Sequence, residues 1–314
     1  MDNPFLSLFS ADLLAASIRM AAPIIFGAVG EVVLQRSGIF NLGMESMYIF
    51  GAFFGVLGAF VSGNVWVGLL TAMAAGILLG LLYGFIVITL RADQSVTGIA
   101  FIILGFGVTS FLLRMIWGIR DVPPYVSSIP AWKIPVLGNI PVIGSIFFNH
   151  NPLVYLAYLS VIVVTFFLFK TTWGLRLRSV GEIPKAAATM GINVIRARYA
   201  AAMFAGCMAA TGGAMLSLTE LNMFIERMSG GRGFFALAAV IFGGWHPVGA
   251  MLACLLFGVG TALQMRLQIF KLPISSDLLI VFPYILTLLF VIFSKTSAKP
   301  QSLGQPYQQE SSLD

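Results

Sequence analysis

The sequence predicts an all-α membrane protein, a polytopic helical bundle with about eight or nine spans and with broken or re-entrant helices. The 314 residues are 59% hydrophobic and only 10% charged, and the mean hydropathy is +0.95. A soluble domain carries about 25% charged residues, so the composition argues against a soluble fold. One helical span takes roughly 20 residues, so the apolar residues suffice for about eight or nine spans.

Apolar runs long enough to cross a bilayer follow one another along the chain, and each is expected to form a helix. They cover 12–34, 39–62, 65–89, 95–118, 152–169, 197–218, 247–265 and 276–294. The run 232–243 is too short to span. We expect it to form a half-helix that enters the membrane and breaks, which requires protein or a cavity around its free backbone groups. Residues 1–294 thus form the predicted membrane domain, and 295–314 a polar, disordered cytoplasmic tail.

Basic residues indicate the orientation. Six of them surround one polar stretch: Lys170, Arg176, Arg178, Lys185, Arg196 and Arg198. The positive-inside rule places this stretch in the cytoplasm, and counting spans outward places the N-terminus outside. The net charge of +6 is then explained by cationic loops that face anionic membrane lipid, so nucleic acid is not an expected partner.

The third run carries a glycine at every fourth position, Gly76, Gly80 and Gly84. These glycines share one face of a helix and allow a neighbouring helix to approach closely. Such patterns are common in membrane helices. We therefore expect a packing face within the bundle rather than a dedicated dimerisation signal.

The sequence contains none of the motifs that would indicate an enzyme or a cofactor site. His150 and His246 have no metal-binding spacing around them, and the glycine-rich stretch Ser229–Phe235 lacks the lysine and hydroxyl of a phosphate loop. No catalytic residue, metal ligand or cofactor is predicted. If ATP is used, another chain must bind it, and this chain is expected to be a transport subunit.

The polar stretch Gly174–Tyr199 contains a short run of good helix formers between two glycines. Pro184 stands at the expected first turn and Gly191 just past the end, which are helix start and stop signals. We expect a short cytoplasmic helix over Pro184–Met190. An ordinary solvated loop is the alternative.

This stretch resembles the coupling loop of permease subunits of ABC importers in the branched-chain amino acid, ribose and nucleoside group, where the pattern G-E-x-P-x-A-A-x-x-x-G-I recurs. The matching residues are Gly181, Glu182, Pro184, Ala186, Ala187, Gly191 and Ile192. Three more blocks agree in the expected order: Ser37–Gly55, Asp93–Phe101 and Gly230–Ala250. The family pattern N-x-G-x-E-G is present as Asn41, Gly43 and Glu45, but Ser46 replaces its last glycine.

The resemblance is strongest for the shorter of two paired permeases in nucleoside and simple-sugar importers. It implies a complex in the bacterial inner membrane with a second, longer permease chain, two cytoplasmic ABC ATPase subunits and an extracytoplasmic substrate-binding protein. The coupling-loop residues would contact the ATPase. A nucleoside is the expected cargo, a simple sugar such as ribose the second choice and a branched-chain amino acid the third. An ion-coupled secondary transporter and a membrane-embedded enzyme are the rival classes.

Three polar residues lie in or beside the first two apolar runs, Glu31, Asn41 and Glu45. An ionisable side chain at the bilayer centre costs about 2.5–3.5 kcal/mol on insertion scales, so such residues usually face a partner or a cavity. We expect Glu31 to pair with Arg36. Glu45 is expected either to contact substrate or to cap the broken backbone near Gly43.

Two glycine-interrupted segments, Ser37–Gly55 and Ser229–Gly244, fall in the two halves of the chain. Transporters with internal repeats place their pathways at broken helices, whose ends offer dipoles and free backbone groups. The aromatic residues and few cationic groups there suit a neutral, flat nucleoside better than an amino acid. The predicted pathway is lined by Asn41, Gly43, Glu45, Ser46, Tyr48, Gly230, Gly231 and Phe234.

Overall fold

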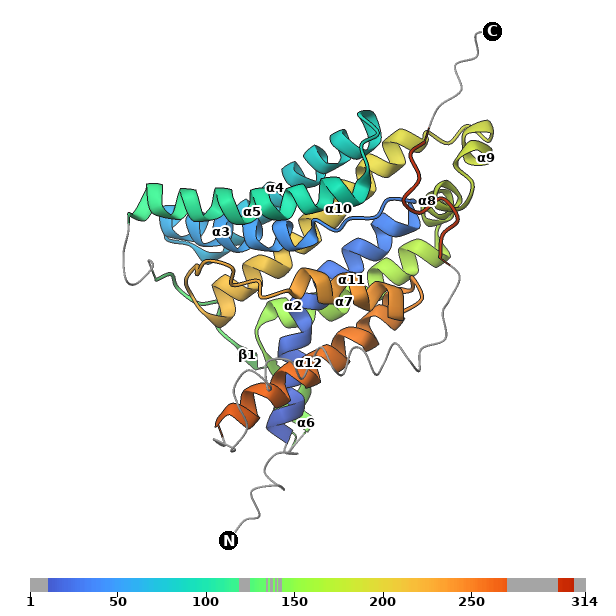
Figure 1. The fold of residues 1–314 in the computed structure, drawn as a ribbon. Helices are drawn as coiled ribbons and strands as arrows, with labels where there is room; N and C mark the ends of the chain where they lie inside the picture. Colours follow the sequence, from blue (N-terminus) through green and yellow to red (C-terminus); the bar gives the residue numbers. More distant parts are fainter. Residues whose placement is uncertain are drawn as a thin grey trace.

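The computed structural model describes residues 11–118, 125–133, 135, 138, 140, 143–269 and 299–307, and these form a helical bundle (Figure 1). Seven helices in this part of the chain are long and apolar enough to cross a membrane. They are α2 (Ala11–Arg36), α3 (Met44–Ser62), α4 (Val65–Gly84, extended by the π-helical turn η1, Phe85–Thr89), α5 (Gln94–Trp117), α7 (Pro152–Lys170), α10 (Val194–Met215, extended by the π-helical turn η3, Leu216–Glu220) and α12 (Pro247–Ile269). The predicted polytopic all-α fold is confirmed, and the predicted run 276–294 lies outside the described residues.

The remaining elements are short. They are the helices α6 (Ile143–Phe147), α8 (Thr172–Glu182), α9 (Pro184–Thr189) and α11 (Arg232–Phe242), and an antiparallel pair of two-residue strands, β1 (Trp132–Lys133) and β2 (Asn149–His150). In Figure 1, α2 starts at the bottom, whereas α8 and α9 lie at the upper right. The start of α2 and the polar α8–α9 stretch therefore lie at opposite ends of the bundle, as the predicted orientation requires.

Local sequence signals explain where several helices begin. Asn64, Asp93, Asn151 and Asn193 each stand just before a helix, and each side chain accepts a hydrogen bond from a backbone N–H of the first turn. Such N-caps satisfy N–H groups that have no partner inside the helix. The boundaries of α4, α5, α7 and α10 therefore follow from residues beside them in the sequence.

Helix α10 lies at the centre of the bundle and packs against α2, α3 and α4. The glycine face of α4 contacts it directly: Gly76 lies against Gly206, and Gly80 against Ala202. The predicted packing face is therefore confirmed within this chain. Helices α4, α5 and α7 leave much of their apolar surface uncovered, as expected of surfaces that face lipid.

The half-helix predicted over 232–243 is confirmed as α11, which has 11 residues. At 1.5 Å per residue its length is about 16 Å, roughly half of a hydrocarbon core of about 30 Å. It begins beside the first turn of α3 and ends beside the C-terminal end of α2, where the Trp245 indole donates to Gln35 Oε1 at 2.6 Å. Helix α12 then runs back along α2.

Residues 299–307 have a defined structure, so the prediction of a tail disordered throughout is wrong for this stretch. The Ser302 N–H donates to the Gly181 carbonyl at 3.0 Å, and the Gly304 N–H donates to the Gly38 carbonyl at 3.1 Å. We call residues Lys299–Tyr307 the C-terminal strap; it is dark red in Figure 1, beside α8. Its polar composition gave no sign of order, because its partners are backbone carbonyls far away in the sequence.

Candidate functional site

The two glycine-interrupted segments meet at Glu45, in the first turn of α3. Glu45 Oε1 accepts hydrogen bonds from Ser229 Oγ at 2.6 Å and from the Gly231 N–H at 2.9 Å, and Oε2 accepts one from the Gly233 N–H at 2.8 Å. The side chain is 2% exposed. Its carboxylate therefore caps the N-terminus of α11, where the helix dipole favours a negative charge.

Glycine is required on the α11 side of this contact. A Cβ atom at Gly233 would lie 2.6 Å from the Glu45 Cα atom, which is closer than packed atoms approach. Gly231 has φ +81°, a conformation that side chains disfavour. The glycine-rich stretch Ser229–Phe235 thus has a backbone role, since it brings free N–H groups onto a carboxylate.

Asn41 orders the turn between α2 and α3. Its Oδ1 accepts from the Gly43 N–H at 2.8 Å, and its own N–H donates to Glu31 Oε1 at 3.2 Å. Glu31 also accepts from Gln35 Nε2 at 2.9 Å. Asn41 and Glu31 are fully buried, so this network holds the broken segment in place.

The expected pairing of Glu31 with Arg36 is wrong. Arg36 Nε instead donates to the Trp245 carbonyl at 2.9 Å. Residues five positions apart point in directions about 140° apart around a helix, whereas residues four apart lie on the same face. Gln35 is therefore the helical neighbour that reaches Glu31.

Ser46 and Tyr48 are both fully buried. The Tyr48 hydroxyl donates to the Pro23 carbonyl at 2.8 Å, and its ring fills the space beside Gly27. Ser46 packs against Gly105 of α5, and its hydroxyl has no hydrogen-bond partner among the described residues. In this conformation both side chains contact protein rather than an open passage.

The predicted residues on the α11 side are more accessible. Phe234 is 44% exposed, and Gly230 is exposed in a turn with φ +54°. Arg232, the cation nearest to them in sequence, lies 4.0 Å from Glu220 Oε2, so an acidic side chain compensates its charge. The structure brings the two predicted groups together at Glu45, and whether they line a passage stays a prediction.

The short helix predicted over Pro184–Met190 is present as α9 (Pro184–Thr189), between α8 and α10, whereas its placement in the cytoplasm stays a prediction. The stretch is therefore helical rather than an ordinary loop. Ile183 separates α8 from α9, and Gly191 turns the chain with φ +79°. Ala186 is exposed, whereas Ala187 is 4% exposed and packs with Val180 and Val194. Only one of the two alanines of the motif therefore points outward.

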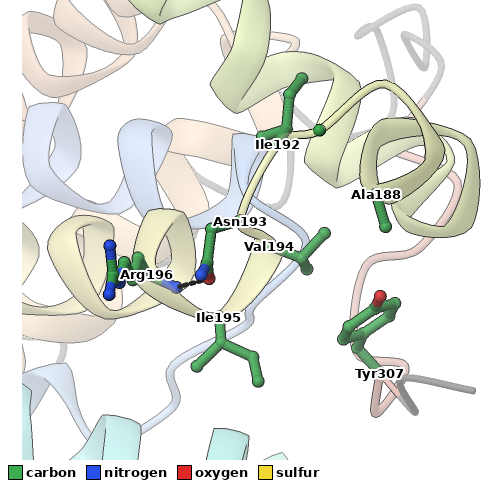
Figure 2. Close-up of a pocket in the computed structure, with 8 residues that line it drawn as sticks. Ala188, Ile192, Asn193, Val194, Ile195, Arg196 and Tyr307 are labelled. Carbon is green, nitrogen blue, oxygen red and sulfur yellow. Dashed lines mark hydrogen bonds between the residues drawn. The ribbon is translucent and has the colours of Figure 1, made fainter. Parts of the chain in front are cut away.

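The C-terminal strap contributes Tyr307 to this region. Figure 2 shows the Tyr307 ring opposite Ala188 and Val194, at one side of a hollow of about 370 Å³ beside the turn at Gly191. A second hollow, of about 590 Å³, lies between Pro184 and the strap. Neither hollow could be predicted from the sequence, because residues about 120 positions away form one wall of each.

Arg198 is the functional candidate that sequence reasoning misplaced. The charge pattern places it among the cations of a solvated loop, but it is 2% exposed in the second turn of α10. Its guanidinium Nε donates to the Ser37 carbonyl at 3.2 Å, and Nη1 donates to the Gln305 carbonyl at 3.4 Å. Nothing in its sequence neighbourhood distinguishes it from the exposed Arg196.

Comparison with known proteins identifies relatives along nearly the whole chain. Residues 13–291 match the family described as the permease component of branched-chain amino acid transport systems. The guanosine ABC transporter permease protein NupQ of Bacillus subtilis is 40% identical over 94% of this chain and 96% of its own. The nucleoside ABC transporter permease protein NupC of Lactococcus lactis is 36% identical over the same shares. A putative glucose ABC transporter permease protein of Haloferax volcanii, TsgC13, is 35% identical over 86% of this chain and 82% of its own.

Proposed function

Because this chain belongs to the permease-component family of branched-chain amino acid transport systems, we propose that it forms the translocation pathway for a nucleoside in an ATP-driven importer. It is a multi-pass membrane subunit, and a separate ATPase subunit and a substrate-binding protein work with it. The observation that carries the nucleoside assignment is the similarity, along nearly the full length, to permeases named for guanosine and nucleoside transport.

The geometry supports a pathway at the junction of α3 and α11. A half-helix that ends inside the bundle leaves N–H groups that need an acceptor, and Glu45 supplies it. Any movement of α11 relative to α3 would therefore have to break or shift the hydrogen bonds between Glu45 and the N-terminus of α11. The aromatic Phe234 at this junction and the compensated charge of Arg232 suit a neutral, flat cargo.

A simple sugar is the second candidate, because the relative from Haloferax volcanii is named a putative glucose permease. A branched-chain amino acid is the third, on the family description alone. An amino acid carries a carboxylate that would need a cation or a helix N-terminus. The N-terminus of α11 is already occupied by Glu45, which disfavours this cargo.

We further propose a second, longer permease as the partner within the membrane. Bacillus subtilis and Lactococcus lactis each also have a more distant relative of this chain, the permease proteins NupP, 24% identical, and NupB, 22% identical. These names pair with NupQ and NupC. Purification of this chain from its native membrane with the second permease in equal amount would support the pairing, and recovery of a homodimer would contradict it.

Uptake of labelled compounds tests the cargo. Cells that express the complete importer should accumulate guanosine or uridine, and an excess of unlabelled nucleoside should compete. Glucose, ribose and leucine are the comparison substrates. Leucine uptake without nucleoside uptake would overturn the proposal, whereas sugar uptake alone would establish the second candidate.

We propose that the exposed side of α9, which begins at Pro184, docks on the ATPase together with the flanking Glu182 and Gly191. The expected ATPase contact of Gly181 is wrong for this conformation, because Gly181 is buried against the Arg36 carbonyl. Ala186 and Met190 both point outward, and Met190 is 82% exposed. Ala186 offers a small side chain to the ATPase, and Met190 a large apolar one. Ala187 supports α9 from within, so a large residue there would disturb the folding of this chain as well as docking. Ala186 is therefore the sharper position for a test.

The substitution Ala186→Arg should leave insertion and folding intact and reduce recovery of the ATPase with the purified permease. Ser128→Arg, at an exposed position far from α9, is the matched control. Undiminished ATPase recovery and nucleoside uptake in the Ala186→Arg protein would contradict docking through α9.

A further inference from the structure

Three parts of the chain meet at the end of the bundle that carries α9. Gly181 at the end of α8 packs directly on the Arg36 carbonyl of α2. The C-terminal strap binds both sides of this contact, through Ser302 to Gly181 and through Gly304 to Gly38. Gly38 has φ +90°, and a Cβ atom there would lie 2.5 Å from Ser302 Oγ. The three backbones are therefore packed without space between them.

Arg198 also binds this junction, through the turn after α2 and through the strap. Besides its bonds to Ser37 and Gln305, its Nη2 donates to Ser302 Oγ at 3.5 Å, and its guanidinium lies 6.0 Å from the centre of the Tyr307 ring. Among the described residues no carboxylate lies within ion-pair distance of it. A buried guanidinium without a carboxylate is costly unless its N–H groups are satisfied, and here the acceptors come from two segments that it holds together.

The turn that Arg198 and the strap hold leads directly to the proposed pathway. Ser37 and Gly38 are followed by Phe40, whose N–H donates to Gln94 Oε1 at 2.7 Å, and by Asn41, which is bound to Glu31. Four residues later Glu45 caps α11. The segment from Gly38 to Glu45 is short and held by hydrogen bonds. A displacement of Gly38 is therefore expected to displace Glu45 as well.

We infer that Arg198 and the C-terminal strap transmit movement of α9 to the turn between α2 and α3, and that Arg198 is a positioning residue for coupling ATP hydrolysis to transport. This inference rests on the proposed docking of the ATPase at α9. Helix α9 has six residues and a small apolar cluster beneath it. The strap adds a direct backbone connection between α8, the neighbour of α9, and the turn that follows α2. A contiguous packed and hydrogen-bonded network of this kind can carry coupling between two sites.

The test uses the complete importer with its ATPase and binding protein in proteoliposomes, and compares Arg198→Ala, Arg198→Lys and a chain that ends before Lys299. Arg91→Ala, an exposed arginine in the turn between η1 and α5, is the control. Three quantities are measured: ATPase recovered with the permease, ATP hydrolysed, and guanosine transported per ATP. A substrate-independent readout is the ATP-dependent change in thiol labelling of Phe234→Cys, in a chain whose Cys207 and Cys254 are replaced by alanine.

For Arg198→Ala and the shortened chain, the ATPase should stay bound and hydrolysis should continue, while guanosine transported per ATP falls about tenfold, as expected when a coupling free energy is lost. The labelling change should disappear, and Arg198→Lys should recover part of both. Loss of ATPase binding would overturn the inference and make the strap a docking surface. If hydrolysis and transport fell equally, guanosine transported per ATP would be unchanged. Arg198 would then have only a structural role, and the inference would be overturned. If wild-type permease itself bound no ATPase, the proposed function would fail instead.

Discussion

Removal of the carboxylate of Glu45 should destabilise the protein in a graded way. In Glu45→Ala, the N–H groups of Gly231 and Gly233 lose their acceptor inside the bundle. A buried donor left without a partner costs about 1–3 kcal/mol, so the two together cost about 2–6 kcal/mol. In Glu45→Gln, the amide oxygen can still accept from Ser229 and Gly231, but the NH₂ group meets the Gly233 N–H. Only one acceptor is lost, which costs about 1–3 kcal/mol.

Thermal unfolding of the purified protein in detergent measures this series. For a chain of this size 1 kcal/mol corresponds to a shift in Tm on the order of 2 °C, so Glu45→Gln should melt below wild type and Glu45→Ala lower still. Glu226→Gln is the control. Glu226 forms an exposed ion pair with Arg114 at 3.3 Å, and such pairs contribute about 0–1 kcal/mol.

The order of the three melting temperatures decides the argument. If Glu45→Ala had the same melting temperature as wild type, the capping of α11 would contribute nothing to stability, and the hydrogen-bond reasoning would be refuted. Transport by Glu45→Gln gives a second reading. Uptake that falls only in proportion to the folded protein indicates a structural cap, whereas a larger fall indicates that Glu45 also acts in the pathway.

Three further predictions concern packing, access and pH. Gly51→Ala should destabilise the protein by about 1–3 kcal/mol, because its Cβ atom would collide with the Ala210 backbone. Gly107→Ala, with open space around it, should be neutral or stabilising. Equal melting temperatures of these two variants would contradict the prediction. Cysteine at Phe234 should react with water-soluble thiol reagents in the resting importer, whereas cysteine at the fully buried Ser46 should react only if ATP or binding protein opens the junction; equal resting rates would count against the described conformation. Burial and the nearby Arg36 guanidinium lower the pKa of His246, so the folded protein binds fewer protons than the unfolded chain, and stability should fall as pH drops below about 6.5. His246→Phe, which keeps the stack on Phe169, should weaken that dependence between about pH 7.5 and 5.5, and an unchanged slope would exclude His246 as its source.

The sequence by itself determined the helical membrane class, the order of the described spans, the half-helix α11 and the short helix α9. Each of these depends on local information. A run of apolar residues pays for its own insertion, an asparagine caps the helix that follows it, and a proline and a glycine delimit α9. The sequence also identified Glu45 and the stretch Ser229–Phe235 as notable, because a carboxylate and a broken helix are costly in a membrane.

Only the tertiary structure decided which of these groups bind one another. Glu45 and Gly233 are 188 positions apart, Arg198 and Ser37 are 161 apart, and Ser302 and Gly181 are 121 apart. The partners are mostly backbone N–H and carbonyl groups, which every residue except proline carries alike. Which of them stays free depends on where a helix breaks and on what packs against the break. The cap on α11, the burial of Arg198 and the ordering of the C-terminal strap therefore follow from packing of the whole bundle.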